Sequence, residues 1–224
     1  MNSYSKDINK YVEAVKEEFK DDLALVLIIG SSCSSMVMEN WSDIDSILVL
    51  KKYNFDIINR IKKIINMFSV KIGTTVFTES EFISKKIDPK VFYHLYLLEN
   101  NQIELQYKRE DFILPTVSFD EVKENYLMDY YHVKHELKRT FLYDKLEKEK
   151  YRAIFKKAYV IMKSILIIDG ELPKNYEETF RGYSKKYNYE YFDYKKFIDD
   201  YMKDNEDYKK IYDYVAEFIF NISK

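Results

Sequence analysis

Residues 23–31 read LALVLIIGS, and residues 42–50 read SDIDSILVL. Leu23–Ile29 is an unbroken aliphatic run, which is typical of a strand buried on both faces, and Ile44–Leu50 is read as a second such strand that carries Asp45 and Ser46 near its start. The first run ends at Gly30, and a loop rich in Ser and Asn follows it. The two segments therefore predict a pair of core strands joined by a polar loop.

The polar residues at the ends of these strands have the composition of a phosphate and metal site. A strand presents residues two apart on the same face, so Asp43 and Asp45 project together while Ile44 points into the core. Adjacent carboxylates repel unless cations lie between them, and magnesium prefers oxygen ligands. A tight turn at Gly30 lets backbone N–H groups approach phosphate oxygens, and the Ser31 hydroxyl adds a donor. The alternative is a surface turn whose aspartates only solvate the strand end.

Gly-Ser after a buried strand, followed by Ser-Asp-Ile-Asp at the start of another, resembles the signature of the polymerase β-like nucleotidyltransferase superfamily. This resemblance implies a small sheet with helices packed on one face, a nucleoside triphosphate donor such as ATP, and release of pyrophosphate. It implies that Asp43 and Asp45 hold magnesium, with two ions expected. It also implies nucleotide binding by Gly30, Ser31 and Ser42.

The family's third acidic residue is missing from its expected place. Members usually carry it on a following strand, but the strand predicted over residues 70–77 reads VKIGTTVF and holds no carboxylate. Glu104, on a strand predicted over residues 103–107, is the nearest replacement, followed by Glu99 and Glu79. Lys71 suggests that a cation takes over part of the charge neutralisation, although a solvated lysine at a strand start has the same pattern.

The remaining patterns divide the chain into two domains. Residues 1–115 predict an α/β (α+β) domain with a small mixed sheet, in which residues 4–19, 57–68 and 88–98 are helical and Thr78 with Glu81 forms a capping box. Residues 116–224 predict an all-α helical bundle, with helices over residues 122–147, 151–168, 176–187, 194–202 and 208–222. Gly170 is expected to stop the second of these helices.

The resemblance extends in type to aminoglycoside and lincosamide nucleotidyltransferases, whose helical second domain closes over the nucleotide and shapes the acceptor pocket. On the most apolar helix of this half, Lys163 is the candidate to reach the triphosphate, with Lys156 and Lys157 as weaker choices. His132 and His135 share a helix face but lack a further metal ligand, so packing or surface roles are expected for them.

Composition limits the partners and the compartment. The chain has 36 basic and 38 acidic residues, a net charge of −2, so it offers no global attraction for nucleic acid or an anionic membrane. The lone Cys33 excludes an internal disulfide, and no apolar run approaches the roughly 20 residues that span a bilayer. A cytoplasmic protein is expected.

Three functions remain open from the sequence. The first is transfer of a nucleoside monophosphate to a hydroxyl of a small molecule, with antibiotics among the candidates. The second is a toxin-like or antitoxin-type transferase that modifies transfer RNA or protein, which near-neutral charge does not favour. The third is a nucleotide-binding module that lost turnover along with its third carboxylate.

Overall fold

The computed structural model describes residues 4–33, 41–142 and 146–221. The chain divides into two compact units, Met1–Phe119 and Asp120–Lys224, and each is described by itself below. Within the described ranges, no helix is both long and apolar enough to cross a membrane.

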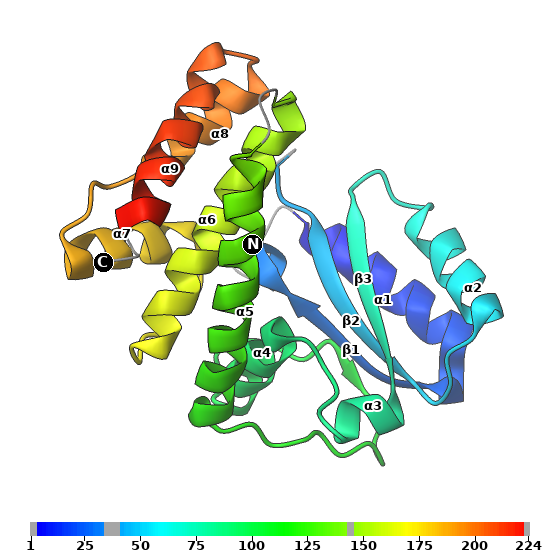
Figure 1. The fold of residues 1–224 in the computed structure, drawn as a ribbon. Helices are drawn as coiled ribbons and strands as arrows, with labels where there is room; N and C mark the ends of the chain where they lie inside the picture. The colour runs from blue at the N-terminus through cyan, green and yellow to red at the C-terminus, as the bar shows by residue number, and fades with distance from the viewer. Residues whose placement is uncertain (1–3, 34–40, 143–145, 222–224) are drawn as a thin grey trace. The chain divides into compact units, whose positions relative to one another are not determined.

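The first unit is built on a small mixed sheet with the strand order β3-β2-β1-β4 (Figure 1). Strands β1 (Leu23–Ile29) and β2 (Ile44–Leu50) pair antiparallel and have the bounds predicted from their aliphatic runs. Strand β3 (Ile72–Thr78) runs parallel to β2, and the two-residue strand β4 (Tyr107–Lys108) lies antiparallel to β1. The expected small mixed sheet is confirmed.

Helices lie on both faces of this sheet, and not on one face as the resemblance implied. Helices α1 (Ser5–Phe19) and α2 (Phe55–Ile65) bury their apolar faces in one core cluster with alternate residues of β1 and β2. Tyr11 of α1 bonds to Ser46, whereas α4 (Pro89–Glu99) reaches Asp45, the preceding residue of β2. Because consecutive strand residues face opposite sides, α1 and α4 lie on opposite faces.

Helix α3 (Glu79–Ile83) leaves β3 through the predicted capping box. The Thr78 hydroxyl accepts the N–H of Glu81, and the Glu81 carboxylate accepts the N–H of Thr78 at 2.8 Å. The box satisfies two backbone donors that the helix itself cannot pair, so the chain turns sharply from strand to helix. Phe82 of α3 then packs against Phe77 and Phe112, with ring centroids 5.9 and 6.2 Å away.

The strand predicted over residues 103–107 is mostly absent, because only its last residue pairs with β1. Val26 opposes Tyr107, but the next backbone donor on this edge, the N–H of Ile28, is taken by the side-chain oxygen of Gln106 at 2.7 Å. A side chain thus replaces the main-chain ladder, and residues 103–106 leave the sheet in an irregular conformation.

The second unit is helical throughout its described elements: α5 (Phe119–Thr140), α6 (Lys148–Ile168), α7 (Tyr176–Tyr187), α8 (Tyr194–Met202), η3 (Glu206–Lys210) and α9 (Ile211–Asn221). Its core is aromatic, with Phe155 of α6 in ring contact with Phe180 of α7 and Phe197 of α8. Gly170, with φ of +95°, follows the end of α6 as predicted.

Four helix bounds in this unit were predicted wrongly by three residues or more: the helices expected from residues 122 and 151 begin at Phe119 and Lys148, and two further bounds have a local cause. The helix expected to reach residue 147 ends at Thr140. The N–H groups of Phe141 and Leu142 donate hydrogen bonds to the carbonyls three residues back, as in a 3-10 turn, and close the last turn of the helix. The helix expected to start at Tyr208 begins at Ile211, because Asn205 caps a separate 3-10 turn before it.

Candidate active site

Both aspartates of the Ser-Asp-Ile-Asp segment lie at the start of β2, and each carboxylate contacts a lysine. The ammonium of Lys71 is 3.1 Å from Oδ2 of Asp43, and that of Lys90 is 2.8 Å from Oδ2 of Asp45. Lys71 directly precedes β3, and Lys90 is in the first turn of α4. Three elements that are distant in sequence therefore bring two cations to two anions.

Asp45 is held between two glycines. Gly30 follows β1 and Gly73 stands beside Asp45 in the parallel register of β2 and β3. A Cβ atom would come within 2.9 Å of Asp45 Oδ2 if it were added to Gly30, and within 3.0 Å of Asp45 Oδ1 if it were added to Gly73. Real Cβ atoms very rarely approach so closely. Each glycine thus leaves room for one carboxylate oxygen, so side chains at either position would displace Asp45.

The turn after β1 is a 3-10 element, η2 (Gly30–Cys33), whose first residue has φ of +73°, a conformation that favours glycine. The N–H of Gly30 donates to Nε2 of His94, a buried histidine of α4, at 3.0 Å. This donor therefore points to the histidine. What Gly30 offers a phosphate is the absence of a side chain and the shape of the turn.

Ser32 ties this turn to the aspartate segment. Its buried hydroxyl donates to the carbonyl of Ile29 at 3.1 Å and accepts the N–H of Asp45 at 3.4 Å. Ser31, the residue expected to bind phosphate, is half-buried in the same turn. Ser42 is buried, and its carbonyl accepts a hydrogen bond from the Tyr4 hydroxyl at 3.1 Å. The structure brings the Gly30 turn and the aspartates together, as the sequence predicted.

No third acid joins these aspartates within the described residues, where no group of three or more His, Cys, Asp or Glu side chains could hold a metal ion. Glu104 is exposed in the irregular segment that leaves the sheet. Glu79 pairs with Arg109 at 2.9 Å, and Glu99 accepts the N–H of Val117 at 3.3 Å. The strand that was to carry Glu104 does not form, so the pattern that suggested it fails, and its catalytic role stays a prediction.

The remaining candidates lie in the second unit. Lys163 is half-buried on α6. Lys157 pairs with Glu136 at 3.3 Å, and the same glutamate lies 3.8 Å from the exposed His132. His135 is exposed as well. Lys157 is therefore engaged within its own unit, and the roles of Lys156, Lys157 and Lys163 stay predictions.

The donor set suits a magnesium–nucleotide complex. Magnesium is usually bound through one or two carboxylates, with phosphate oxygens and water completing its shell. Asp43 and Asp45 supply two carboxylates, and both already face cationic ammonium groups at 3.1 and 2.8 Å. The two carboxylates therefore fit the ion that the resemblance implies, and Asp43 and Asp45 would be the residues to hold it.

The opposite face of β2 is closed beneath the site. The Tyr11 hydroxyl lies 2.9 Å from Ser46 Oγ and 3.0 Å from Thr74 Oγ1, and these two oxygens are 3.0 Å apart. Burial raises the pKa of the Tyr11 phenol, so this group stays protonated. Three hydroxyls thus lock β2 to β3 and to α1 directly behind Asp45.

Several of these site residues were missed by sequence reasoning. Lys90, His94, Ser32 and Gly73 carry no local motif, and Lys90 is 45 residues from its partner Asp45. Only Gly73 left a signal that could have been used, because the chain has 4 glycines and this one interrupts a strand pattern.

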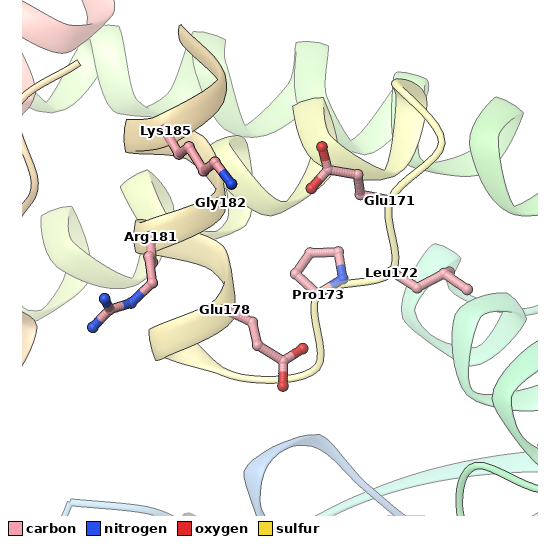
Figure 2. Close-up of a pocket in the computed structure, with 7 residues that line it drawn as sticks. All are labelled: Glu171, Leu172, Pro173, Glu178, Arg181, Gly182 and Lys185. Carbon is pink, nitrogen blue, oxygen red and sulfur yellow. The ribbon is translucent and has the colours of Figure 1, made fainter. Parts of the chain in front are cut away.

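A separate open hollow of about 350 Å³ lies in the second unit, between the connection after α6 and helix α7 (Figure 2). Its charged groups already serve the fold. Glu178 accepts the N–H of Lys174 at 2.9 Å, Glu171 pairs with Lys186 at 3.1 Å, and Arg181 pairs with Glu177. These contacts fasten the connection to α7, and we assign no ligand to the hollow.

No protein-family model matches the sequence, and no curated protein is similar to it. Among solved structures, the chain is similar to spectinomycin adenyltransferase AAD(9) from Enterococcus faecialis, in a crystal structure with ATP and spectinomycin. The similarity covers 100% of both chains with a TM-score of 0.56 and 15% sequence identity. The chain therefore shares the fold of that structure, and the expected architecture of an α+β domain followed by a helical domain is confirmed.

Proposed function

We propose that this chain is a magnesium-dependent nucleotidyltransferase that moves a nucleoside monophosphate, from ATP by preference, to a hydroxyl of a small-molecule acceptor. The observation that carries the proposal is the Asp45 carboxylate, which lies between Gly30 and Gly73 with Asp43 two residues away on the same strand end. Support for the nucleotide and acceptor classes comes from the neighbour of similar fold, whose crystal structure contains ATP and an antibiotic.

In the proposed reaction the acceptor oxygen forms a bond to the α-phosphorus, and the bond from that phosphorus to the β-phosphate oxygen breaks. Pyrophosphate leaves, and the acceptor proton passes to solvent. Magnesium, when bound, neutralises phosphate charge and polarises the attacking hydroxyl. The chain contributes positioning and charge: Asp43 and Asp45 hold the ion, while the Gly30 turn and Ser31 receive the β- and γ-phosphates.

The lysines have a role in this proposal that depends on the state of the site. Without nucleotide, Lys71 and Lys90 neutralise Asp43 and Asp45. With a divalent ion held by Asp43 and Asp45, the ammonium groups of Lys71 and Lys90 would be available to neutralise triphosphate oxygens. Both side chains are substantially exposed, so neither is locked in its ion pair by packing.

A nucleotide-binding module without turnover is the second candidate, and one observation favours it. Gly73 lies directly beside Asp45, so the strand neighbour that could have offered a third carboxylate offers no side chain. A single experiment separates the candidates: the chain is incubated with magnesium, α-labelled ATP and a panel of aminocyclitol and aminoglycoside antibiotics. Labelled acceptor with pyrophosphate supports the enzyme, and nucleotide binding without product supports the module.

The matched variants are Asp45→Asn and Asp56→Asn. Asp45 lies in the site, whereas Asp56 is an exposed residue of α2 that lies 3.9 Å from Arg60. Under the enzyme proposal Asp45→Asn abolishes labelled product, and Asp56→Asn leaves it unchanged. Product formation by Asp45→Asn at the wild-type rate would show that this carboxylate is not the metal ligand.

A further inference from the structure

One peptide group, between Ile29 and Gly30, is held at both of its polar ends. Its N–H donates to Nε2 of His94 at 3.0 Å, and its carbonyl accepts the Ser32 hydroxyl at 3.1 Å. In a trans peptide these two groups point in opposite directions, so a partner at each end fixes the rotation of the whole plane. This plane leads into Gly30, whose Cα faces Asp45.

The bonds of His94 define its protonation state. Nε2 accepts a hydrogen bond from a backbone N–H, so Nε2 carries no proton. Nδ1 lies 2.6 Å from the carbonyl of Lys90, four residues back on α4, and a carbonyl can only accept. The ring is therefore a neutral imidazole with its proton on Nδ1, and both nitrogens have partners that agree on this tautomer.

His94 also connects the two groups that contact Asp45. On one side it holds Gly30, whose missing side chain makes room for Asp45 Oδ2. On the other it binds the carbonyl of Lys90, whose ammonium contacts the same oxygen at 2.8 Å. His94 itself is 3% exposed, and its two ring nitrogens bond to Gly30 and to the Lys90 carbonyl, the neighbours of Asp45.

We propose that His94 is a positioning residue of the nucleotide site: its neutral ring accepts the Gly30 N–H and, with Ser32, fixes the turn that receives the triphosphate. The inference rests on the proposed function, since it assigns His94 to that same site.

Two substitutions separate the effect of losing the hydrogen-bond acceptor from the effect of losing the volume of the ring. In His94→Gln the side-chain oxygen can take the place of Nε2 and accept the Gly30 N–H. In His94→Asn the shorter amide reaches only the position of Nδ1, so it can donate to the Lys90 carbonyl but leaves the Gly30 N–H without an acceptor. His132→Asn, at an exposed histidine of the second unit, is the control.

Equilibrium binding of a non-hydrolysable ATP analogue with magnesium is measured for each protein. Removing the acceptor of a buried donor is expected to weaken binding about tenfold in His94→Asn, whereas His94→Gln should keep most of the wild-type affinity. Equal affinities for wild type and His94→Asn would overturn the inference, as would equal losses in both variants, because packing and not the acceptor would then matter. If His94→Asn does not fold, the glutamine variant and the spectrum described next decide.

Long-range proton–nitrogen NMR spectra of the wild-type protein give a readout that needs no nucleotide. The chain has 3 histidines, and the two exposed ones can be assigned by substitution. The inference requires a protonated Nδ1 and a bare Nε2 at His94, and a proton on Nε2 refutes it. Wild-type protein that binds no nucleotide while His94 has this tautomer refutes the proposed function instead, and the role of His94 in it falls as well.

Discussion

Replacing glycines by alanine tests whether Asp45 is held in a slot with fixed walls. Gly30→Ala adds two costs: a side chain at φ of +73°, about 1–2 kcal/mol, and a Cβ atom 2.9 Å from Asp45 Oδ2. Gly73→Ala adds only a contact, 3.0 Å from Asp45 Oδ1, because its φ is not in the left-handed region. Gly170→Ala adds only the backbone cost, since φ is +95° and nothing lies within 4 Å of the new atom.

The three variants should therefore separate strain from displacement of the carboxylate. Urea unfolding should show a loss of about 1–2 kcal/mol for Gly30→Ala and Gly170→Ala, and a smaller loss for Gly73→Ala. Titration with magnesium and a non-hydrolysable ATP analogue should group the variants differently. Gly30→Ala and Gly73→Ala should bind about tenfold more weakly, which corresponds to ~1.4 kcal/mol, and Gly170→Ala should bind like wild type.

The decisive variant is Gly73→Ala. If it folds with near-wild-type stability and binds the nucleotide complex as tightly as wild type, then Asp45 either moves aside without consequence or takes no part in binding. In both cases the reasoning from the two short contacts is refuted. A loss of binding in Gly170→Ala would refute it differently, because backbone strain alone would then account for the effect of Gly30→Ala.

Substitutions at three further positions probe the surroundings of the site. Tyr11→Phe removes two hydrogen bonds behind β2 and should destabilise the fold by about 1–2 kcal/mol in urea unfolding while nucleotide affinity stays unchanged. Lys90→Met removes an exposed ion pair, so stability should change by less than ~1 kcal/mol, whereas Mn²⁺ titration without nucleotide should show binding about 2–5-fold tighter because the competing ammonium is gone. Gln106→Leu leaves the Ile28 N–H without its acceptor and should cost about 1–2 kcal/mol, while Gln106→Glu, which keeps an acceptor, should cost less.

The contradicting results differ for each substitution. A large loss of nucleotide affinity in Tyr11→Phe would mean that the hydroxyl cluster shapes the site directly. Unchanged Mn²⁺ affinity in Lys90→Met would mean that its ammonium does not compete for Asp45. Equal stability of the two Gln106 variants would show that the side-chain oxygen does not matter at the edge of β1.

Local sequence was sufficient wherever the physical cause was local. The bounds of β1 and β2 were predicted correctly because a strand buried on both faces is mostly aliphatic, and only Asp45 and Ser46 of β2 interrupt that pattern. The same segments located Asp43, Asp45 and Gly30, whose proximity follows directly from the antiparallel pairing of Ile29 with Asp45.

Contacts between distant segments could not be predicted in this way. Lys90 and His94 lie on a helix whose pattern indicates burial but not the partner of each side chain, and Lys90 is separated from Asp45 by 45 residues. The strand predicted around Glu104 is absent for a related reason. The alternation of Glu104 with apolar neighbours was typical of a strand, but Gln106 takes the backbone donor that such a strand would have used.

The slot around Asp45 has a consequence for the variation that the chain can tolerate. A carboxylate with a glycine against each oxygen has no spare length, so one added methylene cannot be absorbed by local relaxation. In a saturation scan scored by nucleotide binding, position 45 should reject glutamate as strictly as asparagine, even though glutamate preserves the charge. Position 43, before the strand begins, should tolerate glutamate better. Selection would then require only a negative charge at position 43, but both a negative charge and the length of aspartate at position 45.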